Sequence, residues 1–213
     1  MPLYKTITVN NGTKVLIWKI EESYEALSEG ITLTSHCQKR VQNMKSDLHR
    51  RGFMSVRHLL AAQGYTDHDL YYDEVGKPHL KDGRKISITH SFIFSAIILS
   101  TYEVGIDIEK QRSKILRIAH KFTPIEEYRT MANDDAVVRK LTIVWGAKES
   151  LYKSFAEKGV SFLQHLYVED FRLDETGTGA SVNYMGKSTN YDIWFIEFEG
   201  FTCVYAHIAE AIH

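Results

Sequence analysis

The sequence predicts an α+β fold with two pseudo-symmetric halves, each a small, mainly antiparallel sheet packed with one long helix. Hairpin signals occur near both ends of the 213-residue chain, and two long helical patterns lie between them. Strand-like runs precede and follow each helical pattern. Strands and helices that follow one another in groups are typical of α+β folds. We place the two halves at residues 1–102 and 103–213.

The N-terminal half begins with a predicted hairpin, because Asn11-Gly12 lies between two β-branched runs and suits a tight turn with positive φ. A short helix is expected over 21–30. A longer helical pattern runs from 35 to about 63, and we expect Gly52 to bend or break it. Residues 86–100, "ISITHSFIFSAIILS", contain two strand-like pieces that suit a second hairpin.

The C-terminal half begins with the strand-like stretch "VGIDIEK" at 104–110. A helical or irregular segment follows, and the second long helix is expected to start at Asp134 or Asp135, either of which can cap it, and to run to Phe155. Two strand-like runs joined by Glu199-Gly200 predict a final hairpin. The "ETGTG" at 175–179 is interpreted as a turn rather than a phosphate loop.

Composition and charge narrow the class of protein. A net charge of −1 gives no reason to expect a nucleic-acid partner. No run approaches the roughly 18 apolar residues of a membrane-spanning helix, and the N-terminal residues lack the pattern of a secretory signal. Cys37 and Cys203 lie far apart in the sequence, which fits free thiols in a reducing compartment. We therefore expect a cytoplasmic protein that binds neither nucleic acid nor membrane.

Two carboxylates on the predicted strand at 104–110 point to a metal. Asp107 and Glu109 alternate with Ile106 and Ile108, so the acids share one face and the isoleucines, taken as the core-facing side, share the other. Neighbouring carboxylates repel and raise each other's pKa, and a divalent cation such as Mg²⁺ removes the conflict. The alternative is an ordinary solvent-facing strand.

The long helix supplies a third acid. Glu149 and Lys153 are four residues apart and lie on one face, with Trp145 one turn earlier on the same side. Taken alone, this pattern equally indicates a surface ion pair of little energetic weight.

Both motifs resemble the paired signature of the 4′-phosphopantetheinyl transferases: "VGIDIEK" and, about forty residues later, "WGAKESLYKSF". "GKP" at 76–78, "ITHSF" at 88–92 and "FTPIE" at 122–126 are similar to further elements of the family. The length is similar to that of the larger, monomeric Sfp-type branch. Thr89 stands where the family usually has Ser, and "EKGVSF" after the helix replaces the commoner G-K-G-L.

The resemblance implies an activity: Mg²⁺-dependent transfer of the 4′-phosphopantetheine moiety of coenzyme A to a serine of an apo acyl or peptidyl carrier protein, with release of 3′,5′-ADP. It implies an active site in the cleft between the halves. Asp107, Glu109 and Glu149 would hold the metal. Glu149 would also be the general base, directly or through water, and Lys153 would neutralise the leaving phosphate.

The resemblance also implies a set of coenzyme A contacts, with Arg57 on the 3′-phosphate and the remaining contacts from Lys77, Pro78, Thr89, His90 and Lys153. Arg50 or Lys45 are further candidates. Glu126 or Glu127 would join the metal shell or orient a water, unless they merely cap a helix.

Basic residues alternate with apolar ones in 111–121, "QRSKILRIAHK". Since carrier proteins are acidic around the modified serine, this segment is a candidate docking surface; the alternative is an amphipathic helix with a solvated face. Two rival functions remain at this level, a Mg²⁺-dependent phosphodiester hydrolase and a non-enzymatic binding module.

Overall fold

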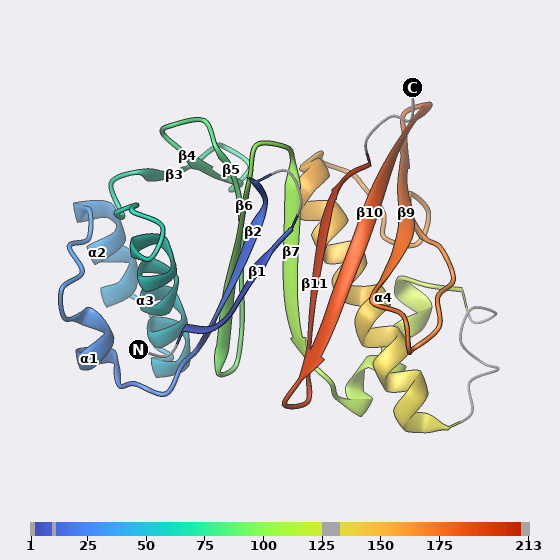
Figure 1. The fold of residues 1–213 in the computed structure, drawn as a ribbon, viewed down its shortest axis with the longest axis horizontal. Helices are drawn as coiled ribbons and strands as arrows, with labels where there is room; N and C mark the ends of the chain where they lie inside the picture. The colour runs from blue at the N-terminus through green and yellow to red at the C-terminus, as the bar shows by residue number, and fades with distance from the viewer. Residues whose placement is uncertain (1–2, 10–11, 125–132, 210–213) are drawn as a thin grey trace. The chain divides into compact units, whose positions relative to one another are not determined.

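The computed structural model describes residues 3–9, 12–124 and 133–209, and the chain forms two compact units, Met1–Thr101 and Tyr102–His213. Each unit contains one antiparallel sheet together with its own helices (Figure 1). The predicted α+β class with two halves is confirmed. The units meet in the sequence one residue before the predicted boundary.

The N-terminal unit is built on a six-stranded sheet with the order β1-β2-β6-β5-β4-β3. Both hairpins predicted here are present: β1 pairs with β2, and β5 with β6. Gly12, before β2, has φ +76°, a value that favours glycine. The strands are β1 Leu3–Thr8, β2 Lys14–Lys19, β3 Leu70–Tyr72, β4 Pro78–Leu80, β5 Lys85–Ser91 and β6 Phe94–Ser100.

The helical pattern of this unit is interrupted at a different place from the one predicted. It is divided into α2 Ser35–Gln42 and α3 Asp47–Ala61, after the short α1 Tyr24–Ser28. Ser46 caps α3 by accepting a hydrogen bond from His49 N, so the chain starts a new helix there. Gly52 lies inside α3 and does not break it. A Cβ at Gly52 would lie 3.4 Å from Cγ of His90, at ordinary contact distance from that ring.

The C-terminal unit has a five-stranded sheet with the order β7-β11-β10-β9-β8. The predicted final hairpin is present, with Glu199 and Gly200 both at positive φ. The "ETGTG" segment is only partly a turn, because β9 already begins at Gly177. The strands are β7 Val104–Lys110, β8 Leu166–Val168, β9 Gly177–Tyr184, β10 Lys187–Phe198 and β11 Phe201–Ile208.

Helix α4 Asp134–Phe155 packs against this sheet and buries an apolar core beneath it. Its cap is Asn133, which accepts a hydrogen bond from Ala136 N at 2.9 Å, rather than either predicted aspartate. Between β7 and α4 the chain forms two 3-10 turns, η2 Ser113–Arg117 and η3 Ala119–Lys121. No helix in the described part of the chain is long and apolar enough to cross a membrane.

Candidate active site

Two glycines let α4 lie directly on β7, which carries Asp107 and Glu109, and on its neighbour β11. A Cβ at Gly105 would come 1.8 Å from the carbonyl oxygen of Ser150, and one at Gly146 would come 2.7 Å from Cγ2 of Val204. The hydroxyl of Ser150 contacts the same place, 3.0 Å from the carbonyl oxygen of Val204. Since real Cβ atoms do not approach other atoms so closely, each motif needs its glycine for the helix to approach its strand.

The acids of β7 face the helix. Asp107 lies opposite Val204 in the β7–β11 pair, and Val204 belongs to the core beneath α4. Directly opposite residues of an antiparallel pair point to the same side of the sheet. Ile106 and Ile108 therefore lie on the other face of β7, and both are buried, as predicted for the core-facing side. The alternation is as predicted, and the polar face is the one that α4 covers.

Lys153 pairs with Asp107. Its ammonium group donates to Oδ1 of Asp107 at 2.7 Å and to the carbonyl oxygen of Ile106 at 2.9 Å. Asp107 is 5% exposed, so the pair is screened from solvent on the aspartate side. The last turn of α4 thus supplies a positive charge to Asp107 on β7, rather than one half of a surface pair within α4.

Glu109 and Glu149, the other two acids, are both harder to ionise than an ordinary carboxyl group. Burial, and next to it the charge of Asp107, raises the pKa of Glu109 to about 7, although a hydrogen bond from Trp145 opposes the shift. Burial and the charge of Asp107 also raise the pKa of Glu149, against the effect of Lys153. The structure therefore brings the three predicted carboxylates close enough to disfavour one another's charge.

The chemistry of this donor set fits Mg²⁺, which prefers carboxylate oxygens and keeps water or phosphate as its other ligands. The three carboxylates are not, however, arranged as metal ligands in this structure. Within the described ranges, no three His, Cys, Asp or Glu side chains are grouped so as to hold a metal ion. Glu126 and Glu127, the further candidates, lie outside the described residues.

Two hollows flank Trp145. One, of about 190 Å³, is lined by Glu109 and by basic residues at and after the end of β7. The other, of about 530 Å³, is lined by Glu149 and by an aromatic wall formed by Trp145, Tyr152 and Phe162. The ring of Trp145 contacts Phe122 and Phe162, with centroids 5.0 and 5.4 Å away. The first hollow is lined by Glu109, Lys110, Arg112, Lys114, Ile115, Ile118, Thr142 and Trp145, and the second by Ile118, Lys121, Trp145, Glu149, Tyr152 and Phe162.

Sequence reasoning missed Lys148, which supports this wall. The side chain is buried, and its ammonium group donates to the carbonyl oxygens of Phe122 and Phe162, the latter at 2.9 Å. One lysine thus ties the segment before α4 to the segment after it. A lysine within the apolar flank of the long helix was the available signal, because such a residue needs buried acceptors.

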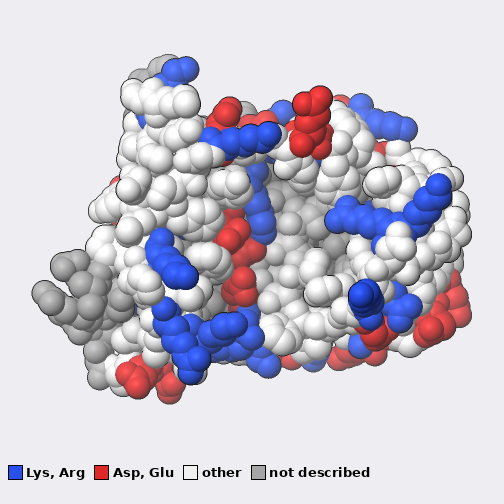
Figure 2. Space-filling view, turned by 180° about the vertical axis from the view of Figure 1, so that it is seen from behind, with Lys and Arg blue, Asp and Glu red and all other residues white. Residues whose placement is uncertain are grey.

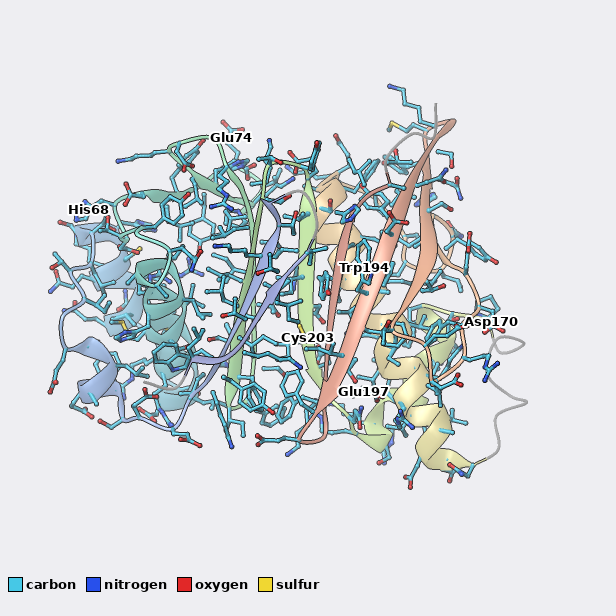
Figure 3. All side chains as sticks on the ribbon, in the orientation of Figure 1. His68, Glu74, Asp170, Trp194, Glu197 and Cys203 are labelled. Atoms are coloured by element: carbon cyan, nitrogen blue, oxygen red, sulfur yellow. The ribbon has the colours of Figure 1, made fainter. Side chains whose placement is uncertain are left out.

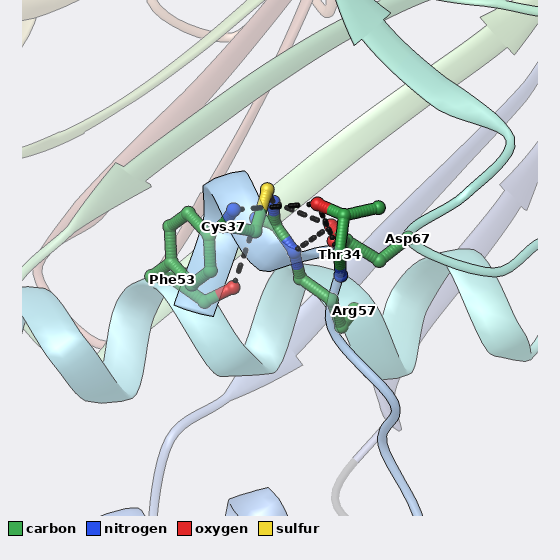
Figure 4. Close-up of polar contacts among 5 residues, drawn as sticks. All are labelled: Thr34, Cys37, Phe53, Arg57 and Asp67. Atoms are coloured by element: carbon green, nitrogen blue, oxygen red, sulfur yellow. Dashed lines mark hydrogen bonds and ion pairs between the residues drawn. The ribbon is translucent and has the colours of Figure 1, made fainter. Parts of the chain in front are cut away.

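Arg57, predicted to contact the 3′-phosphate, has a buried side chain in the structure. Its side chain is 3% exposed and its guanidinium donates to Oδ1 of Asp67 from Nε at 3.0 Å and from Nη2 at 2.9 Å (Figure 4). Nη1 donates to the carbonyl oxygen of Phe53 at 3.2 Å. The guanidinium is thus occupied by internal acceptors and shielded from solvent, which argues against contact with a phosphate.

The other predicted coenzyme A residues of the N-terminal unit lie at its sheet. Lys77 ends the turn before β4, and Pro78 is the first residue of that strand. On β5, Thr89 is buried and His90 is exposed, with the His90 ring 6.0 Å from that of His49 on α3. Their roles stay predictions.

The unit that carries these residues is similar to known proteins. Residues 103–206 match the family model of the 4′-phosphopantetheinyl transferase superfamily. The match covers most of the C-terminal unit, a little under half of the chain. It is also similar to the "4′-phosphopantetheinyl transferase gsp" of Aneurinibacillus migulanus, with 28% identity over 134 residues, 62% of this chain and 54% of that protein. The matched stretch thus spans about half the length of the relative.

Proposed function

We propose that this protein transfers the 4′-phosphopantetheine moiety of coenzyme A to a serine of an apo acyl or peptidyl carrier protein and releases 3′,5′-ADP. The observation that carries the proposal is the cluster of Asp107, Glu109 and Glu149 on β7 and α4, with Lys153 beside it. Three carboxylates kept together against their repulsion suit a site for a cation and a diphosphate.

In this reaction Asp107, Glu109 and Glu149 would hold Mg²⁺, which supplies charge neutralisation at the diphosphate. The serine oxygen forms a bond to the β-phosphorus, and the bond from that phosphorus to the bridging oxygen breaks. Glu149 takes the proton of the serine hydroxyl, for which burial and its raised pKa make it a better acceptor than an ordinary carboxylate. Lys153 stabilises the negative charge on the departing 3′,5′-ADP.

In the N-terminal unit, we assign the coenzyme A contacts to Lys77, Pro78, Thr89 and His90. The burial of Arg57 makes Arg50, on the same helix, the stronger candidate for the 3′-phosphate. The side chain of Arg50 is 37% exposed, and its ion pair with Asp47 is long at 3.6 Å. A planar guanidinium at the surface suits a phosphate with two free oxygens.

Carrier docking is assigned to the basic segment 111–121. Arg112 and Lys114 line the hollow that contains Glu109, and Lys121 lines the one that contains Glu149. Figure 2 shows basic side chains gathered at the lower edge of the C-terminal unit. A basic rim beside the reacting groups would steer an acidic carrier toward them. We further propose that the protein acts as a monomer in the cytoplasm.

The test is incubation with coenzyme A, Mg²⁺ and several apo-carriers, read by intact mass. Wild-type protein should add one phosphopantetheine group to a carrier, and Glu149→Gln should add none at the same time point. Coenzyme A cleavage without carrier modification would indicate a hydrolase instead. A melting temperature that responds to neither coenzyme A nor Mg²⁺, with no reaction, would indicate a binding module.

A further inference from the structure

The turn between β3 and β4 is held by a single carboxylate. Asp73 begins the turn, Glu74 lies near its tip (Figure 3), and Lys77 ends it. The main chain closes with Asp73 N donating to Lys77 O at 3.1 Å and Gly76 N donating to Asp73 O at 3.0 Å. Gly76 has φ +87°, which makes so tight a closure possible.

The side chain of Asp73 fixes the interior of the same turn. Its Oδ1 accepts from Val75 N at 3.0 Å and from Lys77 N at 2.9 Å. Its Oδ2 lies 2.9 Å from Nε2 of His79, whose ring stacks on Tyr71 with centroids 5.3 Å apart. The main chain of Lys77 is therefore bonded to Asp73 through both its N–H and its carbonyl group, and Asp73 is in turn anchored to β4.

We propose that Asp73 is a positioning residue for coenzyme A binding: it holds the backbone of Lys77 in the conformation from which its ammonium group reaches a phosphate, without touching the cofactor itself. The inference rests on the proposed function, because that function assigns a coenzyme A contact to Lys77, whose ammonium group suits one of the cofactor's phosphates. The physical reason is preorganisation. A turn that is already ordered does not lose conformational freedom when the ligand binds.

Strand β4 provides a matched control at its other end. Asp82 holds the following turn in a similar manner, with Oδ1 accepting from Arg84 N at 3.0 Å and Oδ2 accepting from the hydroxyl of Tyr65 at 2.6 Å. Asp82 and Asp73 thus each join one main-chain turn to one ring-bearing side chain. Substitution of either removes comparable contacts, but only Asp73 bonds Lys77.

The experiment compares Asp73→Ala, Asp73→Asn and Asp82→Ala by steady-state kinetics, by direct coenzyme A titration and by melting temperature. We expect Asp73→Ala to raise the KM for coenzyme A about tenfold, with kcat and the KM for carrier unchanged. Asp73→Asn keeps an oxygen for the two N–H groups and should recover most of the affinity. Asp82→Ala should lower the melting temperature to a similar extent and leave coenzyme A binding at the wild-type level.

Two results would overturn the inference. One is unchanged coenzyme A affinity in Asp73→Ala; the other is an equal loss in Asp82→Ala, which would reveal a general effect of loosening the strand. The direct titration separates this question from the reaction. If wild-type protein binds coenzyme A but modifies no carrier, the proposed function fails while the comparison of the three variants still decides the role of Asp73. If wild-type protein binds no coenzyme A, both fail.

Discussion

Two arginines on α3 occupy different environments, and this difference predicts different consequences of their removal. Arg57→Ala leaves Asp67 as a buried charge without its partner, which should cost about 3–5 kcal/mol of the free energy of unfolding. Arg50→Ala removes a partly exposed side chain and should cost well under about 1 kcal/mol, but raise the KM for coenzyme A. Urea unfolding and coenzyme A titration measure the two effects.

Dephospho-coenzyme A is the control for this pair. If Arg50 binds the 3′-phosphate, Arg50→Ala should bind the dephospho form as well as wild-type protein does. A stable Arg57→Ala that discriminates poorly between the two cofactors would restore the original assignment of that phosphate to Arg57.

The buried Arg57–Asp67 pair makes the stability of the fold depend on pH in the acidic range. Burial alone would raise the pKa of Asp67, but the N–H of Thr34 and the charge of Arg57 outweigh it and lower the pKa below 3.8. A carboxylate with a lowered folded-state pKa stabilises the fold above its unfolded value and loses that contribution as pH falls through the folded value. The melting temperature should therefore fall steeply below pH 3.8, and Asp67→Asn should weaken that dependence. An equally steep fall in Asp67→Asn would assign it to other carboxylates.

The three carboxylates of the site should separate activity from stability. Replacing Asp107, Glu109 or Glu149 by alanine should lower turnover by orders of magnitude. Glu109→Ala and Glu149→Ala should be as stable as wild-type protein or more so, since both groups have raised pKa values. Asp107→Ala should lose some stability because Lys153 loses its partner. Near-wild-type turnover at limiting Mg²⁺ in any variant would remove that residue from the metal site.

At the scale of elements, the contact of α4 with β7 depends on the absence of one methyl group. Gly105→Ala would place a carbon 1.8 Å from a backbone oxygen of Ser150, so strand and helix must separate. We expect a loss of more than about 3 kcal/mol in stability, together with loss of Mg²⁺-dependent stabilisation. Gly52→Ala is the control, because its nearest neighbour lies at 3.4 Å and helix propensity favours alanine by about 1 kcal/mol. Equal stability of the two variants would contradict the close contact.

Elements with strong local signals were predictable from sequence, and those decided by packing were not. Glu199-Gly200 and Gly12 set their hairpins by turn chemistry alone. Gly52, by contrast, resembles a helix breaker locally but lies inside α3, where a Cβ would meet the ring of His90 only at ordinary contact distance. The environment of Arg57 depends on Asp67, ten residues along the chain, and no periodicity predicts that pair. For the acids, the alternation showed that they share a face but not which face α4 covers.

At the scale of the whole molecule, the basic segment 111–121 is the surface proposed to dock the carrier protein. Reversing the charges of Arg112, Lys114 and Arg117 should raise the apparent KM for carrier and flatten its dependence on salt, because rim charges act on association and are screened. The KM for coenzyme A should hardly change. A triple reversal that leaves the carrier KM unchanged at low ionic strength would place docking elsewhere, with the loop after Phe155 as the next candidate.

The pairing of β7 with β11 affects how the chain folds during its synthesis on the ribosome. Within the described sheet, β7 has β11 as its one hydrogen-bonded neighbour, and the residues opposite Asp107 and Glu109 are Val204 and Thr202. The acidic strand therefore leaves the ribosome long before the strand that fixes it. Such distant pairing closes a large loop and slows folding. Until residues 201–208 are synthesised, β7 lacks the strand with which it pairs, and an unpaired strand edge of this kind is prone to aggregate.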